Sequence, residues 1–265
     1  MQQNNLVSSQ YFLPDSIFQL TSKYTWQQIF IGESKSEVFK LQHSRDENLY
    51  LKTAPRKVAH LTHEKQKLEW LAGKLPVPQV RAFAFDESHD YLLISEIDGV
   101  AASDDSFIKN SQKVVEQLAC GLHMIHSLSI EDCPFDMRLE RKIELARRNV
   151  EQNLVDENDF DEQRLGRTAA DLFQELTETK PKTEDLVFTH GDYCLPNIIL
   201  KDFKLAGFID WGGAGIADYY QDVALLARSV ETNFGAEWLP ILFENLKLEP
   251  DHQKIDFYQL LDEFF

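Results

Sequence analysis

The sequence predicts an α+β fold with two lobes, and three observations lead to this class. Residues 24–94 contain short runs of alternating apolar and polar residues, which are typical of strands, and one helical pattern. From residue 103 onward, apolar residues recur at helical spacing. The chain has 265 residues, 43% of them apolar, which is enough to bury a large core. We expect a small lobe over residues 1–96, with an antiparallel sheet and one helix, and a larger, mostly helical lobe over residues 97–265.

The composition restricts the partners and the compartment that we expect. The formal net charge of −17 argues against nucleic acid, which needs a basic surface, and favours a cationic partner. On composition alone, acidity that serves solubility is an equal alternative. No apolar run could span a membrane and residues 1–10 do not resemble a signal peptide, so we expect a cytoplasmic protein, monomeric or homodimeric. The cysteines lack metal-ligand spacing, which predicts reduced thiols at Cys120, Cys133 and Cys194.

The small lobe is expected to contain a buried ion pair. In the strand predicted at residues 49–52, Tyr50 and Lys52 share one face because side chains alternate along a strand. The helix predicted at residues 60–73 places Glu64 on the same side as its apolar residues. A buried carboxylate needs a partner, and Lys52 is the obvious one. The alternative is that each residue pairs at the surface.

The larger lobe is expected to be built from helices. An apolar stripe formed by Val115, Leu118, Leu122 and Ile125 marks one helix, on which His126 is interpreted as a satisfied core or packing residue without a catalytic role. Further helices are predicted over residues 139–154, 168–176, 222–232 and 255–262.

Two segments near residue 200 carry the chemistry. Residues 189–197 read THGDYCLPN, with Asp192 and Asn197 spaced as in the H-R-D-x-x-x-x-N loop of protein kinases. Asp210 opens a D-W-G sequence that has the form of D-F-G. The residues between Asn197 and Asp210 predict two short strands around a turn, a hairpin that would bring the two side chains together. The ordered pair of motifs predicts an ATP-dependent kinase.

The chemistry of phosphoryl transfer explains these residue types. A carboxylate must orient the acceptor hydroxyl and take its proton, which is the role expected of Asp192. An amide oxygen and a second carboxylate bind the Mg²⁺ ions that neutralise the phosphates, and Asn197 and Asp210 are the candidates. The Lys52 and Glu64 pair would position the phosphates.

Two further segments of the small lobe are candidates for nucleotide contact. Residues 31–39 predict a turn over the triphosphate, with Ser34 as the contact, although G-x-G-x-x-G is absent. Residues 95–99 predict the crossover between the lobes, where Ser95 and Ile97 would bind adenine through main-chain groups.

The chain resembles the aminoglycoside 3'-phosphotransferase family, from Gly32 to Phe265. The matching segments are 49–52 (LYLK), 73–78 (GKLPVP), 95–99 (SEIDG), 132–134 (DCP), 187–192 (VFTHGD), 207–210 (GFID), 217–218 (AD) and 260–265 (LLDEFF). The resemblance implies a protein-kinase-like fold and transfer of the γ-phosphate of ATP or GTP, with Mg²⁺, to the 3'-hydroxyl of an aminoglycoside antibiotic.

The resemblance also implies roles for individual residues. Tyr50 would stack on adenine with Ile199 and Ile209 on the other side, and Ser34 and Lys52 would bind phosphates. Carboxylates from a helical insert and from the chain end would bind the polycationic acceptor. The acceptor residues implied in this way are Asp159, Asp161, Glu162, Arg228, Asp262, Glu263 and Phe265, the last through its terminal carboxylate. Alternatively, the insert acids solvate a helix start and the final acids belong to a frayed terminus.

Two positions depart from the family pattern. Gly213 stands where the family usually has arginine, and residues 231–233 read ETN where relatives tend to carry acids. These departures concern the acceptor more than the type of reaction. The alternatives are a related kinase acting on choline, a fructosamine or a macrolide, and a nucleotide-binding pseudokinase, although a binding module would not need Asp192.

Overall fold

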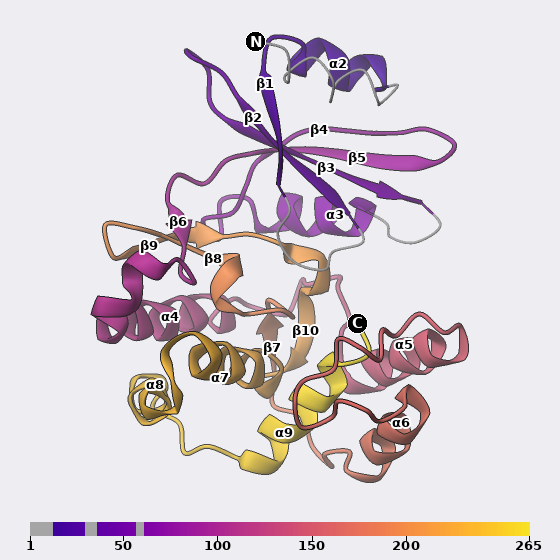
Figure 1. Ribbon diagram of the computed structural model, residues 1–265, viewed down its shortest axis with the longest axis vertical. Helices are drawn as coiled ribbons and strands as arrows, with labels where there is room; N and C mark the ends of the chain where they lie inside the picture. Colours follow the sequence, from indigo (N-terminus) through magenta and orange to yellow (C-terminus); the bar gives the residue numbers. More distant parts are fainter. Residues whose placement is uncertain (1–12, 30–35, 57–60) are drawn as a thin grey trace. The chain divides into compact units, whose positions relative to one another are not determined.

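The computed structural model describes residues 13–29, 36–56 and 61–265, and these form two units (Figure 1). The first unit consists of Met1–Asp98 together with the return segment Ala206–Gly212. The second consists of Gly99–Leu205 and Gly213–Phe265. The first is built around strands and the second around helices, so the predicted α+β class is confirmed.

The first unit contains a five-stranded antiparallel sheet in the order β1-β2-β3-β5-β4. The central strand β3 alternates as predicted, since Leu49 and Leu51 are fully buried while Tyr50 and Lys52, on the other face, are less so. Leu51 pairs with Phe39 and Leu93 on the neighbouring strands, in the middle of the core. The strands are β1 (Thr25–Ile29), β2 (Glu37–Gln42), β3 (Leu49–Pro55), β4 (Val80–Phe85) and β5 (His89–Ser95).

In the described residues of this unit there are two helices, and α3 (Leu61–Leu71) is the one that the sequence predicts. It packs on the sheet because Leu61, Leu68 and Leu71 lie on its buried side, where Glu64 also lies (Figure 1). The helix stops before Gly73, whose φ of +77° is readily adopted only by glycine. The helix α2 (Asp15–Thr21) was not predicted; it is short and buries only Ile17 and Thr21.

The second unit is mostly helical, with two small sheets. One sheet has the order β6-β8-β9, and the other pairs β7 with β10 in antiparallel fashion. The division between the units falls within β9, the second strand of the predicted hairpin. The strands are β6 (Val100–Ala101), β7 (Leu186–Thr189), β8 (Ile198–Lys201), β9 (Lys204–Phe208) and β10 (Gly215–Asp218).

The structure confirms the helices that the sequence predicts in the second unit. Their bounds are α4 (Ser111–His126), α5 (Leu139–Glu151), α6 (Ala169–Glu178), α7 (Tyr220–Phe234), α8 (Leu239–Leu246) and α9 (His252–Asp262). Only α8 was not predicted, because its two turns give a short pattern after Pro240. The helices α5, α6 and α9 pack around the end of the chain (Figure 1).

The acids between α5 and α6 do not lie on a helical insert, so that expectation is wrong. The segment consists of turns. Asp156 accepts from the main-chain N of Asn158 at 3.0 Å, and Asp161 accepts from the main-chain N of Gln163 at 3.0 Å. Such side-chain to backbone bonds compete with helix formation. Asp159, Asp161 and Glu162 are therefore presented from turns.

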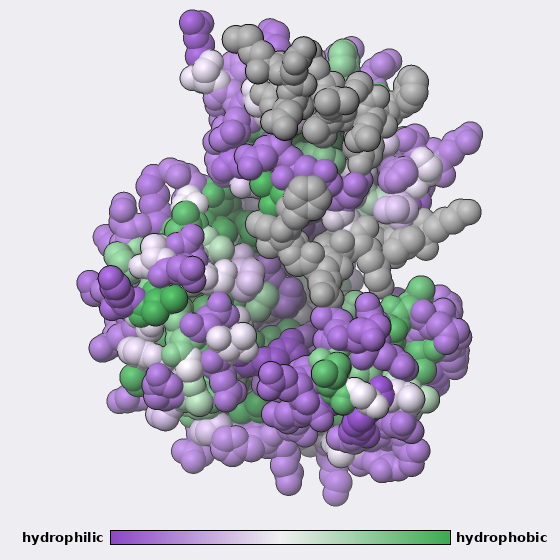
Figure 2. Space-filling view, viewed as in Figure 1, coloured by the Kyte–Doolittle hydropathy of each residue, from purple (hydrophilic) through white to green (hydrophobic). Residues whose placement is uncertain are grey.

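The surface view in Figure 2 is mostly hydrophilic, as expected for a protein with a net charge of −17. Within the described residues, every helix is too short or too polar to cross a bilayer.

Candidate active site

In the first unit, Lys52 lies between two carboxylates. Its Nζ is 2.6 Å from Oε1 of Glu64 and 3.2 Å from Oδ1 of Asp210. Burial lowers the pKa of Lys52, but the two carboxylates outweigh burial and hold that pKa above its ordinary value. The predicted pair between Lys52 and Glu64 is confirmed. The ammonium group is therefore charged at neutral pH and fixed in position.

The loop that carries Asp210 is held in a strained conformation. Asp210 has a φ of +61°, which non-glycine residues rarely adopt. Beside it, Trp211 is fully buried and its Nε1 donates to the main-chain O of Phe208 at 3.2 Å. The buried Lys67 of α3 donates to the main-chain O of Gly212. Anchors after Asp210 thus hold its carboxylate at a partly exposed position, with 47% of the side chain accessible.

Tyr50, the predicted adenine contact on β3, is held by a neighbouring lysine. Tyr50 is half-buried, and Nζ of Lys40 lies 5.7 Å from the centre of its ring. Burial raises the pKa of Tyr50. Lys40 is in turn held by Glu96, whose Oε1 is 2.6 Å from Nζ. Lys40 therefore links the ring of Tyr50 to Glu96, the residue that follows β5.

The crossover segment is also held by the first unit. The Oγ of Ser95 accepts from the main-chain N of Gln79 at 2.9 Å. Ile97 packs so closely on Gly207 that a β-carbon there would lie 2.7 Å from Cδ1 of Ile97. Ile209 is half-buried on the return segment, whereas Ser34 lies outside the described residues.

In the second unit, the loop after β7 brings Asp192 and Asn197 together. The Nδ2 of Asn197 donates to Oδ2 of Asp192 at 2.7 Å and to its main-chain O at 3.0 Å. The same Nδ2 lies 3.2 Å from Sγ of Cys194. Burial, followed by the charge of Asp192, raises the pKa of Cys194, so this thiol stays protonated. The amide nitrogen is engaged on the Asp192 side, which directs the amide oxygen of Asn197 away from that carboxylate.

Two glycines of this unit make close contact through their backbones. Gly191 has a φ of +85°, and a β-carbon there would lie 2.2 Å from the main-chain O of Gly213. At Gly213, a β-carbon would lie 3.3 Å from both atoms of the backbone carbonyl group of Gly191. No side chain fits at Gly191 without movement of the backbone. The glycine that departs from the family pattern therefore packs directly behind the loop of Asp192.

A buried carboxylate on α7 fixes the backbone of the same loop. The Oδ2 of Asp222 accepts from the main-chain N of His190 at 2.8 Å, and its Oδ1 accepts from that of Gly191 at 2.8 Å. His126 places Nε2 3.0 Å from Oδ2 of Asp222. Asp222 is fully buried, so these contacts replace its hydration. The two residues immediately before Asp192 are held by this one side chain.

The role of Asp222 was missed from the sequence, which placed it only as the first residue of a helix. His126 is predicted to be a satisfied core or packing residue, and its buried side chain, bonded to Asp222, agrees with that prediction. The argument that paired Glu64 could have found Asp222, because it too is an acid within an apolar helical pattern. No local pattern predicts that His126 contacts Asp222, because the two residues lie on different helices that are far apart in the sequence.

The acids at the chain end are bound to arginines. Arg228 donates to Asp262, and its Nη1 lies 3.7 Å from Oε1 of Glu263. Arg164 is buried, donates to Asp161, and has Nη1 3.7 Å from the same Oε1. The Oε2 of Glu263 accepts from the main-chain N of Asp161 at 3.2 Å. The structure therefore brings together four of the predicted acceptor residues, but in a network that includes two guanidinium groups.

The remaining predicted residues of the second unit take no side-chain part in this network. Asp159 and Glu162 are exposed. Phe265 is 50% exposed at the chain end. Ile199 is buried in β8, where it packs against the backbone of Gly99.

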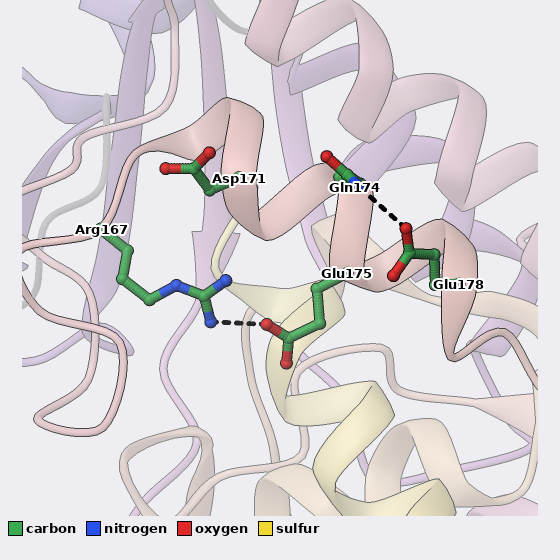
Figure 3. A pocket seen from close by; sticks show the side chains of 5 residues that line it. All are labelled: Arg167, Asp171, Gln174, Glu175 and Glu178. Carbon is green, nitrogen blue, oxygen red and sulfur yellow. Dashed lines mark hydrogen bonds and ion pairs between the residues drawn. The ribbon is translucent and has the colours of Figure 1, made fainter.

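A hollow beside α6 is lined by Arg167, Asp171, Gln174, Glu175 and Glu178 (Figure 3). Four of these residues bond in pairs: Arg167 donates to Glu175 at 2.5 Å, and Gln174 donates to Glu178 at 2.8 Å. It contains none of the predicted site residues, and these four side chains are already paired with one another.

Comparison with known proteins agrees with the motifs. Residues 25–258 match the phosphotransferase enzyme family. An aminoglycoside 3'-phosphotransferase of Niallia circulans is 39% identical over 255 residues, which are 95% of this chain and 97% of that protein. One from Streptomyces fradiae is 37% identical over 256 residues, 91% of this chain and 96% of that protein.

Solved structures extend the similarity to the fold. A crystal structure of an aminoglycoside 3'-phosphotransferase of type VIII superposes with a TM-score of 0.86 at 32% identity, over 95% of this chain and 98% of that one. An aminoglycoside phosphotransferase from Streptomyces rimosus, solved with ADP and streptomycin, gives a TM-score of 0.80 at 26% identity, over 94% of this chain and 95% of that one.

Proposed function

This chain belongs to the phosphotransferase enzyme family, and on that premise we propose that it transfers the γ-phosphate of ATP to the 3'-hydroxyl of aminoglycoside antibiotics, which would confer resistance to them. Relatives at up to 39% identity that match over nearly their whole length carry this activity in their names. The observation that carries the proposal is the loop in which Asn197 bonds both the carboxylate and the main-chain O of Asp192. We place the reaction in the cytoplasm, where ATP is available.

The proposed roles in the first unit concern the nucleotide. Lys52 would bind phosphate oxygens, because its charge is maintained by Glu64 and Asp210. Tyr50 and Ile209 would contact adenine, with main-chain groups of Ser95 and Ile97 at its edge. The complex of the Streptomyces rimosus relative with ADP supports nucleotide binding by this fold.

The proposed roles in the second unit concern the hydroxyl and the acceptor. Asp192 would accept the hydroxyl proton as phosphate transfer proceeds, and the Nδ2 of Asn197 keeps its carboxylate oriented. Asp159 and Glu162 are exposed acids that suit a polycation. Asp262, Glu263 and Phe265 would contact further parts of the acceptor. Because Arg228 and Arg164 offset part of the negative charge there, the proposed role of Arg228 is to orient the acids.

Magnesium fits the two residues that the sequence nominates. The carboxylate of Asp210 is partly exposed, and the amide oxygen of Asn197 is directed away from the bonds made by its nitrogen. Carboxylate and amide oxygens are ligands that Mg²⁺ prefers. Mg²⁺ would supply positive charge that neutralises the nucleotide phosphates, and each of the two residues carries an oxygen suited to it.

The experiment that tests the proposal is a coupled ADP-release assay with purified protein and Mg-ATP. The panel contains kanamycin, neomycin, amikacin, choline and erythromycin, so that each alternative acceptor class is represented. ADP release above background only with the aminoglycosides is the expected result. Stimulation by choline or erythromycin alone would replace the proposed acceptor, and ADP release with none of them would favour a binding role.

A further inference from the structure

One helix of the second unit holds the last two residues of the chain from one side. Lys142 and Asn149 lie seven residues apart on α5, which is close to two helical turns, so their side chains project from the same face. The Nδ2 of Asn149 donates to the main-chain O of Phe264 at 2.8 Å. The Nζ of Lys142 lies 4.9 Å from the centre of the Phe265 ring.

Lys142 is an unusual residue for this position because it is 5% exposed. Within the part of the chain that the structure describes, no carboxylate lies within the 4.0 Å of an ion pair from its Nζ. Burial lowers its pKa, and the charges of Asp262, Asp222 and Asp192 offset only part of that effect. A buried ammonium without a close counter-ion is costly. Its nearest identified partner is the face of an aromatic ring, which attracts a cation more strongly when water is excluded.

The residues after α9 need such contacts if their acids are to be held in one arrangement. The helix α9 ends at Asp262, so helical hydrogen bonding does not fix the residues that follow it. Phe264 is buried and meets the ring of Phe173 edge to face at 5.9 Å. Phe265, in contrast, is half exposed, and the described structure ties it through its main-chain N, 3.1 Å from the O of Asp262, and through Lys142. Lys142 thus contacts the exposed ring of Phe265 from the side of α5.

We propose that Lys142 is a positioning residue for acceptor recognition: together with Asn149 it clamps Phe264 and Phe265, so that the neighbouring acids Asp262 and Glu263 are presented in one arrangement. This inference rests on the proposed function, because it concerns the acceptor that those acids would bind. It assigns Lys142 no contact with the reacting atoms. A buried cation close to these acids also moderates their mutual repulsion.

The kinetic test uses Lys142→Met, which removes the positive charge but keeps a side chain of similar volume. Lys142→Met should raise the acceptor KM about 10-fold, the range expected from loss of a buried cation–π contact, while the nucleotide KM changes less than about 2-fold. Lys142→Arg keeps a cation over the ring and should restore most of the acceptor affinity. Arg141→Met, an exposed cation on the same helix, is the matched control and should behave as wild type. Equal losses of acceptor and nucleotide binding in Lys142→Met, or none, would overturn the proposal.

A double-mutant cycle tests whether Lys142 acts through Phe265. Phe265→Leu removes the ring but keeps an apolar side chain. Once the ring is gone, Lys142→Met should add little to the acceptor KM, whereas additive effects would show that the lysine acts by another route.

A readout that does not depend on the reaction separates this inference from the proposed function. Carboxypeptidase A should release Phe265 several-fold faster from Lys142→Met and from Asn149→Ala than from wild type and Arg141→Met. Release at the wild-type rate from both variants would contradict the clamp even if the enzyme phosphorylates aminoglycosides. Conversely, faster release from an enzyme without aminoglycoside activity would leave the clamp in place and refute the proposed function. If Lys142→Met does not fold, Asn149→Ala provides the same two measurements.

Discussion

The charged groups of the two units are held in different ways. In the first unit, Lys52 contacts Glu64 and Asp210 directly, so one cation fixes two acids through their side chains. In the second unit, Asp222 fixes the loop of Asp192 through two main-chain N–H groups. The arrangement in the first unit therefore depends on the identity of three side chains, whereas the loop of Asp192 in the second unit depends on backbone geometry. Substitutions in the two halves should fail in different ways.

The largest effect is expected at Asp192. Asp192→Ala should reduce kcat by about 10²- to 10⁴-fold, because it removes the proposed proton acceptor. The free energy of unfolding should change little, since the side chain is only half-buried. Steady-state rates and thermal unfolding measure the two quantities. A variant that retains turnover near that of wild type would exclude Asp192 as the base.

Asp222→Ala should affect activity and stability together, unlike Asp192→Ala. It leaves the buried N–H groups of His190 and Gly191 without an acceptor, which costs about 2 to 5 kcal/mol of unfolding free energy. The displaced loop should lower kcat by up to about 10²-fold. Denaturant unfolding measures the loss of stability, and initial rates measure the loss of kcat. Loss of activity at unchanged stability would show that Asp222 acts on the reactants instead of on the backbone.

Gly213→Arg tests how closely the backbone of the catalytic half is packed. The departure from the family pattern alone would suggest that an arginine adds useful positive charge and raises kcat. A β-carbon at this position, however, would lie 3.3 Å from the backbone of Gly191, so we expect a lower kcat and an overpacking cost of about 1 to 3 kcal/mol. The kcat of Gly213→Arg, measured with an aminoglycoside that wild type phosphorylates, decides between these two expectations. A higher kcat would mean that Gly191 moves aside without disturbing Asp192.

A smaller effect distinguishes two acids of the segment between α5 and α6. Asp161→Asn should cost about 1 to 3 kcal/mol of unfolding free energy, because the buried Arg164 loses one of its acidic partners. Asp159→Asn, at an exposed site, should leave stability unchanged and raise only the acceptor KM. The same behaviour in both variants would contradict the division between structural and acceptor-facing acids.

The smallest expected effect is a pH dependence at Glu263. Burial, followed by the charge of Asp161, raises the pKa of Glu263 from 4.5 to about 7. Between these values the folded protein keeps a proton that the unfolded chain has lost, so the contribution to stability falls as pH rises. The Tm of wild type minus that of Glu263→Gln should therefore decrease from about pH 4.5 to about pH 7. A constant difference would indicate that Glu263 titrates normally.

Much of the first unit could be predicted from the sequence because its signals are local. Alternation along β3 placed Lys52, and helical spacing on α3 placed Glu64, so their pairing followed from the cost of a buried charge. The spacing of Asp192 and Asn197 similarly identified a loop in which the structure bonds the two side chains. The family and the type of fold that the motifs predicted are also confirmed.

The rest depends on contacts between residues far apart in the chain. His126 and Asp222 are 96 residues apart, and no local pattern links them. The arginines that bind Asp161, Asp262 and Glu263 were not foreseen, because a run of acids indicates charge but not which charges are neutralised. The turns between α5 and α6 were mistaken for a helix because the competing bonds from Asp156 and Asp161 cannot be weighed without coordinates.

The central claim is transfer to a 3'-hydroxyl, and the most direct measurement uses two acceptors that differ only at that position. Kanamycin B and its 3'-deoxy analogue tobramycin carry the same amines, so the acidic residues should bind both. We predict that kanamycin B drives ADP release and yields a monophosphorylated product, whereas tobramycin gives no release above background and inhibits competitively. Equal rates of ADP release with the two antibiotics would contradict the account, because the phosphate would then be carried by another hydroxyl.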